Sequence, residues 1–289
     1  MANVRMVCPV AATLGEGPVW CERRNVLWFV DIKAPAVHCF DPATSGLASW
    51  PAPAPVGWLA LTESEVLLAG MKTGLSRFDP ATGAFTRIAD VEPDLPGNRL
   101  NDATVGPDGI LWFGSMDDAE MAPTGRYYRY DGTHIRACAF DPVTITNGPA
   151  LSPDGRTFYA VDTLGRRILA CPVAEDGALG APEPFVAIAE ADGYPDGPTV
   201  DAEGCVWIGL WAGWQARRYS PDGELLASIK FPAVNITKVA FGGPDLKTLY
   251  ATSARKGLSL EDLAAQPLAG NLFAATLDVA GRPAGRVRA

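Results

Sequence analysis

Histidine is nearly absent from this chain of 289 residues, in which only His38 and His134 occur. Neither belongs to a Gly-x-Ser-x-Gly context, so a serine hydrolase triad is disfavoured and both histidines are expected to be structural. The six cysteines are widely scattered and form no Cys-x-x-Cys pair. That spacing argues against a zinc site or a disulfide framework and favours reduced, mostly buried thiols.

Long apolar runs are missing as well. No segment approaches the roughly 18 apolar residues that a membrane helix needs. The first nine residues lack the charged start and apolar core of a secretory signal. The net charge of −9 would repel the phosphates of nucleic acid. We therefore expect a cytoplasmic protein with neither membrane nor nucleic-acid partners, acting as a monomer or a weak homo-oligomer.

What the chain does contain is a repeat. A short strand-like motif recurs six times, and its successive starts lie 40, 44, 47, 48 and 43 residues apart. The six copies are Leu27–Val30, Leu67–Gly70, Leu111–Gly114, Phe158–Val161, Val206–Gly209 and Leu249–Thr252. Turn-forming segments such as Gly106–Gly109 and Ser152–Gly155 precede them. A unit of about 40–50 residues with several short strands has the size of one propeller blade.

Six such units fill the chain and leave no room for a second domain. The sequence therefore predicts an all-β fold, a six-bladed β-propeller formed as a single domain by residues 1–289. The only clear helix signal is a capping box at Ser259–Asp262, with a stop at Pro267. We expect this short helix to lie in an excursion within the last blade.

Four oxygen-bearing side chains share one position in this repeat. Each stands 10 or 11 residues before a strand motif, and the four are Glu16, Asn101, Asn147 and Asp196. Three of them are followed directly by Gly-Pro. Equivalent positions of successive blades form a ring around the propeller axis. We therefore expect the four side chains to converge at the mouth of a central channel.

Two carboxylates enclosed together are costly unless one stays protonated or a cation neutralises them. A donor set made only of oxygen favours a hard ion such as Ca²⁺, Mg²⁺ or Mn²⁺, although carboxylates also bind Zn²⁺ and Fe²⁺. The structural alternative is that a repeat protein simply reuses its Asx-Gly-Pro turns. The coincidence of chemistry, position and number favours one divalent cation at the axis.

At these residues the chain resembles the SMP-30/gluconolactonase/LRE family, the group of regucalcin, gluconolactonases and bacterial pentonolactonases. The segments that carry the resemblance are Leu14–Pro18, Asn98–Asp102, Leu111–Met116, Ile145–Pro149, Ser152–Gly155, Tyr194–Gly197 and Phe241–Leu246. Within the family, Phe29–Lys33 and Thr252–Gly257 most resemble bacterial xylonolactonases and arabinolactonases. The resemblance extends along essentially the whole chain.

The resemblance implies a six-bladed propeller with one divalent metal held by Glu16, Asn147 and Asp196. It implies that the protein is a hydrolase that acts on the carboxylic ester bond of cyclic sugar lactones. The substrate would be a pentono- or hexonolactone, such as xylonolactone, arabinonolactone or gluconolactone, and the product the open-chain aldonic acid. Asp196 would be the catalytic general base. Arg99 would bind substrate hydroxyls, and Asn101 would be a further metal ligand or substrate contact.

Three further residues are candidate substrate contacts. In some family members an acidic residue that follows a Gly-Thr-Met stretch shapes the sugar pocket. Here that stretch reads Gly114–Asp118, so either Asp117 or Asp118 could serve. Lys238 lies close to the ring position of the repeat and could meet a carboxyl or hydroxyl group. Tyr194 is expected in the wall of the pocket.

Two other functions compete with lactone hydrolysis. A non-catalytic propeller that binds calcium or acts as a scaffold would use the same fold and even the same metal site. Such a scaffold has no need of clustered carboxylates on the axis. A propeller esterase of the paraoxonase type is expected to use histidine, of which this chain has only two. Acid release from lactones separates the enzyme from the scaffold.

Overall fold

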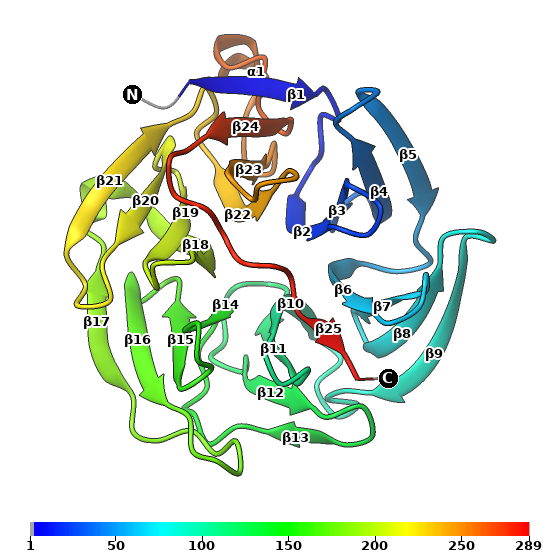
Figure 1. The fold of residues 1–289 in the computed structure, drawn as a ribbon, viewed down its shortest axis with the longest axis vertical. Coiled ribbons are helices and arrows are strands. Elements are labelled where there is room, and N and C mark those ends of the chain that lie inside the picture. The colour runs from blue at the N-terminus through cyan, green and yellow to red at the C-terminus, as the bar shows by residue number, and fades with distance from the viewer. Residues whose placement is uncertain (1–2, 289) are drawn as a thin grey trace.

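The computed structural model describes residues 3–288, which form sheets of mostly antiparallel strands around a common centre (Figure 1). Successive strands along the chain are hydrogen-bonded neighbours. The first set of four contains β2 (Gly15–Cys21), β3 (Val26–Asp31), β4 (Ala36–Asp41) and β5 (Gly46–Pro51). The second contains β6 (Val56–Thr62), β7 (Leu67–Met71), β8 (Gly74–Asp79) and β9 (Ala84–Asp90).

The same pattern continues along the chain. The third set contains β10 (Asn98–Val105), β11 (Leu111–Asp117), β12 (Tyr127–Tyr130) and β13 (Ile135–Ala137). The fourth contains β14 (Thr146–Leu151), β15 (Thr157–Asp162), β16 (Arg167–Pro172) and β17 (Glu183–Ala187). The fifth contains β18 (Tyr194–Val200), β19 (Val206–Trp211), β20 (Gln215–Tyr219) and β21 (Leu225–Lys230), with the 3₁₀ turn η1 (Glu190–Asp192) just before it.

The last set includes the first strand of the chain. It contains β22 (Ile236–Gly242), β23 (Thr248–Ser253), β24 (Leu272–Thr276) and the N-terminal β1 (Val4–Cys8). Strand β1 pairs antiparallel with β24, which closes the ring. This set joins the preceding one in an eight-stranded sheet through a single parallel pair, Gly197 with Lys238. The first strand of each set lies nearest the centre in Figure 1, so the architecture is propeller-like.

The repeated motif explains how the sheets pack. Every copy lies in the second strand of its set, and aromatic residues of the motif contact neighbouring sheets. Ring centroids are separated by 5.7 Å for Trp58 and Phe113 and by 5.3 Å for Trp112 and Phe158. Each buried aromatic side chain removes about 150–250 Å² from water. These contacts hold the sheets as a ring and fix the positions of the innermost strands.

Two further predictions concern local structure. The capping box predicted at Ser259 is confirmed, and it starts helix α1 (Leu260–Ala265) between β23 and β24. All six cysteines lie within the described residues, and none forms a disulfide there. No helix among residues 3–288 is long and apolar enough to cross a membrane.

The C-terminal segment was not foreseen. After β24 it crosses in front of the centre of the ring in Figure 1 and ends in the short strand β25 (Arg286–Val287). Strand β25 pairs in parallel with Leu61 and Thr62 at the end of β6. The segment therefore covers the end of the ring where the innermost strands finish.

Candidate metal and active site

A cavity of about 340 Å³ lies at the opposite end of the ring, where the innermost strands begin. All four side chains that share the ring position of the repeat line it: Glu16 of β2, Asn101 of β10, Asn147 of β14 and Asp196 of β18. Each lies at a break in the register between its strand and the next. Such bulges redirect side chains. Here they turn one polar side chain from each of four strands into the same cavity.

The Gly-Pro pairs explain the bulges. Gly17 and Gly148 adopt φ angles of 56° and 71°, a region that favours glycine. The following proline has no N–H to donate to the neighbouring strand. The pairing is therefore interrupted directly after Glu16 and Asn147.

A chain of hydrogen bonds orients the two amides. Arg99 Nη1 donates to Asn101 Oδ1 at 2.6 Å, and Asn101 Nδ2 donates to Asn147 Oδ1 at 2.9 Å. Asn147 Nδ2 in turn donates to Thr163 Oγ1 at 2.9 Å. Buried amides with such partners have little rotational freedom. The Asn147 amide is therefore held in one orientation at the cavity that the two carboxylates also line.

The two carboxyl groups of the cavity are buried, and both have raised pKa values. Glu16 and Asp196 are each only 5% exposed. Burial raises the pKa of Glu16 to about 8, and the negative charge of Asp102 adds to this effect. Burial also raises the pKa of Asp196 well above its usual range, with a further contribution from Glu16. Enclosed carboxylates of this kind require a counter-charge if both are to be ionised near neutral pH.

The neighbouring cations are already engaged. Arg99 binds Asp118 and Asn101, and Lys238 binds Asp102. A divalent ion would supply the missing charge, and the all-oxygen donors suit a hard one. Among residues 3–288, no group of three or more His, Cys, Asp or Glu side chains could hold a metal. A cation at the axis would therefore need the amide oxygen of Asn147 in addition to the two carboxylates.

Asp117 and Asp118 have different surroundings. The carboxylate of Asp117 accepts hydrogen bonds from the backbone N–H groups of Ala119, Met121 and Ala122, and Asp117 does not line the cavity. Asp118 Oδ1 instead accepts from Arg99 Nε at 2.8 Å and from Lys33 Nζ at 2.7 Å. Asp117 thus shapes the loop, whereas Asp118 orients the arginine that faces the cavity.

Lys238 also differs from its expected position. It does not line this cavity, because its ammonium contacts Asp102 and donates to the Ala103 carbonyl oxygen at 3.0 Å. Tyr194 does line the cavity, as expected. The guanidinium of Arg166 lies 4.1 Å from the centre of the Tyr194 ring, a cation–π contact that fixes the ring.

Two charged residues of the cavity were missed. Glu120 and Lys256 both line it, and their side chains form an ion pair. They stand on loops of the third and last strand sets, 136 positions apart. Nothing in their own sequence surroundings marks this contact. Trp211 also lines the cavity, and the centre of its ring lies 5.9 Å from Lys256 Nζ.

Comparison with known proteins gives consistent matches. The SMP-30/Gluconolactonase/LRE-like region matches residues 14–255. An L-arabinolactonase from Azospirillum brasilense is 38% identical over 95% of this chain and 92% of its own. A 6-deoxy-6-sulfogluconolactonase from Pseudomonas putida is 34% identical over 96% and 97%, respectively.

A solved structure is also similar over the whole chain. The crystal structure of a calcium-binding protein, regucalcin, from Agrobacterium tumefaciens matches with a TM-score of 0.96 at 32% identity, covering 100% of this chain and 98% of that one. The matched region of the family, residues 14–255, includes all four residues of the central ring. The chain belongs to the SMP-30/gluconolactonase/LRE-like family.

Proposed function

We propose that the chain hydrolyses a sugar lactone, a pentono- or hexonolactone such as arabinonolactone, xylonolactone or gluconolactone, to the open-chain aldonic acid. The observation that carries this proposal is the burial of Glu16 and Asp196 beside Asn147 in one cavity of about 340 Å³. The names of two relatives, an L-arabinolactonase and a 6-deoxy-6-sulfogluconolactonase, support the same substrate class.

Glu16, Asn147 and Asp196 would hold one divalent cation, with Ca²⁺, Mg²⁺, Mn²⁺, Zn²⁺ and Fe²⁺ as candidates. When bound, the ion would act as a Lewis acid on the lactone carbonyl. The similar regucalcin structure is described as that of a calcium-binding protein, which supports a divalent cation in general. Asn101 would position either the Asn147 ligand or a substrate hydroxyl.

The chain's own residues would accept the proton and bind the substrate. Asp196 would accept a proton from the attacking water, and a bound cation would favour the ionised carboxylate that this role needs. A C–O bond then forms at the carbonyl carbon, the bond to the ring oxygen breaks, and that oxygen takes up a proton. Arg99, fixed by Asp118, would bind substrate hydroxyls. Tyr194 would contact the sugar from the wall.

We further propose that residues 1–289 form one six-bladed propeller domain. The six consecutive strand sets, and the pairing of β1 with β24, support this count. The unpaired thiols of all six cysteines support a reducing, cytoplasmic compartment.

Acid release from a panel of lactones tests the proposed function. The protein would be incubated with each divalent ion and with arabinono-, xylono-, glucono- and galactonolactone, and the rate compared with spontaneous hydrolysis. We expect acceleration of at least one lactone. No acceleration with any combination would reject the enzyme and favour a non-catalytic calcium-binding propeller.

Asp118→Asn is expected to raise KM more than it lowers kcat. The substitution removes the negative charge that fixes Arg99, and a hydrogen bond to a charged group contributes about 1.5–3 kcal/mol, which corresponds to a KM increase of roughly 10-fold or more. Steady-state kinetics on the preferred lactone measures this split.

Lys33→Met is the matched control, because it removes the other partner of Asp118 and leaves the arginine contact in place. Its KM should stay close to that of the parent protein. An unchanged KM in the Asp118→Asn variant would show that the arginine does not bind substrate.

A further inference from the structure

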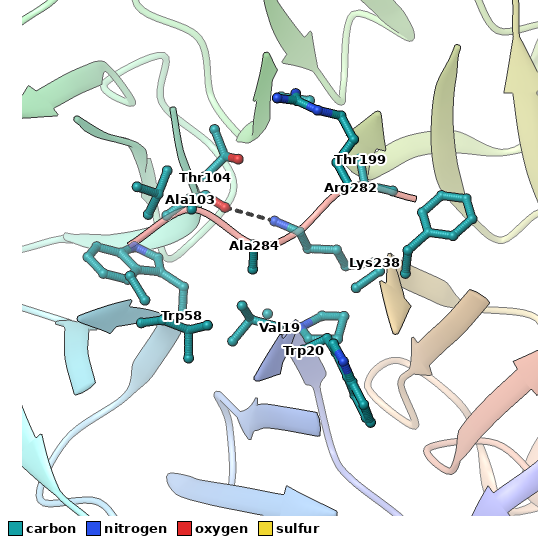
Figure 2. Close-up of a pocket in the computed structure, with 18 of the residues that line it drawn as sticks. Val19, Trp20, Trp58, Ala103, Thr104, Thr199, Lys238, Arg282 and Ala284 are labelled. Carbon is teal, nitrogen blue, oxygen red and sulfur yellow. Dashed lines mark hydrogen bonds between the residues drawn. The ribbon is translucent and has the colours of Figure 1, made fainter. Parts of the chain in front are cut away.

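Lys238 and Asp102 form a buried ion pair outside the cavity that Glu16 and Asp196 line. Lys238 is 6% exposed and Asp102 1% exposed. Figure 2 shows the lysine side chain reaching from β22 across the centre to the carbonyl oxygen of Ala103 on β10. Its ammonium also contacts the Asp102 carboxylate. The pair therefore links the innermost strands of two different sheets.

Asp102 connects this pair to a third innermost strand. Its Oδ2 atom accepts a hydrogen bond from the backbone N–H of Gly148 at 2.9 Å. Gly148 directly follows Asn147, and Asp102 directly follows Asn101. The carboxylate thus holds the backbone of β14 immediately beside a proposed metal ligand.

The lysine stem reaches a fourth innermost strand. A Cβ atom added to Gly197 would lie 2.5 Å from Lys238 Cγ and 2.6 Å from its Cβ, so the stem packs directly on this glycine. Gly197 is also the one residue of β18 that pairs with β22, through Lys238. Because Gly197 follows Asp196, the lysine supports the backbone beside the second proposed ligand.

Lys238 belongs to a different compartment from the ligands. It lines a second cavity of about 150 Å³, which Arg282–Gly285 of the C-terminal segment close from the far end. Figure 2 shows Ala284 of that segment among the residues that line this cavity with the lysine. The lysine does not line the cavity that holds Glu16 and Asp196. Lys238 therefore acts on the proposed ligands without lining their cavity, either through the backbone it supports or through its charge.

We propose that the Lys238–Asp102 pair is a positioning element that holds the backbone at Asn147 and Asp196 in the arrangement needed to bind the cation. This inference rests on the proposed metal-dependent function of the cavity. Residues behind metal ligands commonly change metal affinity by about 10–100-fold when they are replaced. We expect an effect of that size from this pair.

Two substitutions of opposite charge separate positioning from simple electrostatics. Lys238→Met removes a positive charge near the cation, so electrostatics alone predicts tighter metal binding. Asp102→Asn removes a negative charge, so electrostatics alone predicts weaker binding. Loss of positioning weakens binding in both variants. The double variant restores the overall charge but not the ion pair, so it should stay weak and show strong non-additivity.

The experiment measures Mn²⁺ affinity by isothermal titration calorimetry for the full-length parent, the two single variants and the double variant. Melting temperatures of the metal-free proteins and kcat and KM of the loaded proteins are recorded in parallel. We expect affinities about 10–100-fold weaker in all three variants. If Lys238→Met fails to fold, the affinities of the nearly isosteric Asp102→Asn variant and of the double variant test the positioning role instead.

Arg218→Met is the matched control, because Arg218 forms an ion pair with the buried Asp201 at the far end of β18. It should lower the melting temperature without changing Mn²⁺ affinity. Parent-like affinity in folded Asp102→Asn, or tighter binding in Lys238→Met, would overturn the positioning role. A parent protein that neither binds Mn²⁺ nor hydrolyses a lactone would instead reject the proposed function itself, and this inference with it.

Discussion

Asp196→Asn is expected to reduce lactone hydrolysis to the spontaneous background rate. The amide has nearly the same shape, but it can neither accept a proton from water nor supply a charged ligand. Loss of a general base alone costs about 10²–10⁴-fold in rate, and the weakened cation site adds to this. Initial rates of acid release at saturating lactone and metal measure the effect. Asp196→Ala should behave in the same way.

The same substitution is expected to stabilise the metal-free protein at alkaline pH. The pKa of Asp196 is raised in the fold, first by burial and then by the charge of Glu16. A carboxyl whose pKa is higher in the folded state costs stability as the pH rises above its unfolded value of about 4. The melting temperature of the Asp196→Asn variant, measured with a chelator present, should therefore exceed that of the parent by a margin that grows as the pH rises above about 5.

Asp201→Asn provides the matched control for both measurements. Asp201 is also a fully buried aspartate, but it lies beyond the far end of β18 and binds Arg218. Its substitution should lower stability and leave turnover at the parent level. An Asp196→Asn variant that keeps about a tenth of the parent rate, far above what remains after the loss of a general base, would remove Asp196 from the catalytic role.

Glu16→Gln is expected to weaken divalent-cation affinity by more than about 100-fold, because it removes a direct charged ligand and even indirect partners contribute 10–100-fold. Calorimetric titration with Mn²⁺ gives the affinity. Turnover should be lost at low metal concentration and should recover as metal is raised, since Asp196 is still present to take up the proton.

This recovery distinguishes the two carboxylates. The Asp196→Asn variant should stay inactive at any metal concentration, whereas the Glu16→Gln variant should not. Unchanged Mn²⁺ affinity after the Glu16 substitution would contradict its place among the ligands. Recovery of both variants at high metal would show that Asp196 is a ligand only.

The parts of the site that repeat were predictable from sequence. Glu16, Asn101, Asn147 and Asp196 share one position relative to the strand motif, and each stands at the same kind of bulge on an innermost strand. A repeated local geometry therefore placed four distant residues in one cavity. The order of the strands followed from the same repeat, because successive strands are hydrogen-bonded neighbours.

Features set by single long-range contacts were not predictable. Lys238 shares the ring position approximately, but its direction depends on Asp102, which lies 136 positions away. Asp117 is the last residue of β11 and Asp118 begins the turn after it, so a register uncertain by one residue exchanges the two. The ion pair of Glu120 and Lys256 joins two loops that are longer than the matching connections in the other strand sets. The C-terminal segment likewise lies outside the repeat.

Titration of metal-free protein with a divalent ion, at a saturating concentration of the lactone it hydrolyses best, measures whether turnover depends on one bound ion. Calorimetry gives the number of ions bound per chain, and acid release gives the rate at each occupancy. We expect the rate to rise in proportion to occupancy and to reach its plateau at a single ion per chain. Full turnover in the presence of chelator, or an occupied site without acceleration, would contradict it.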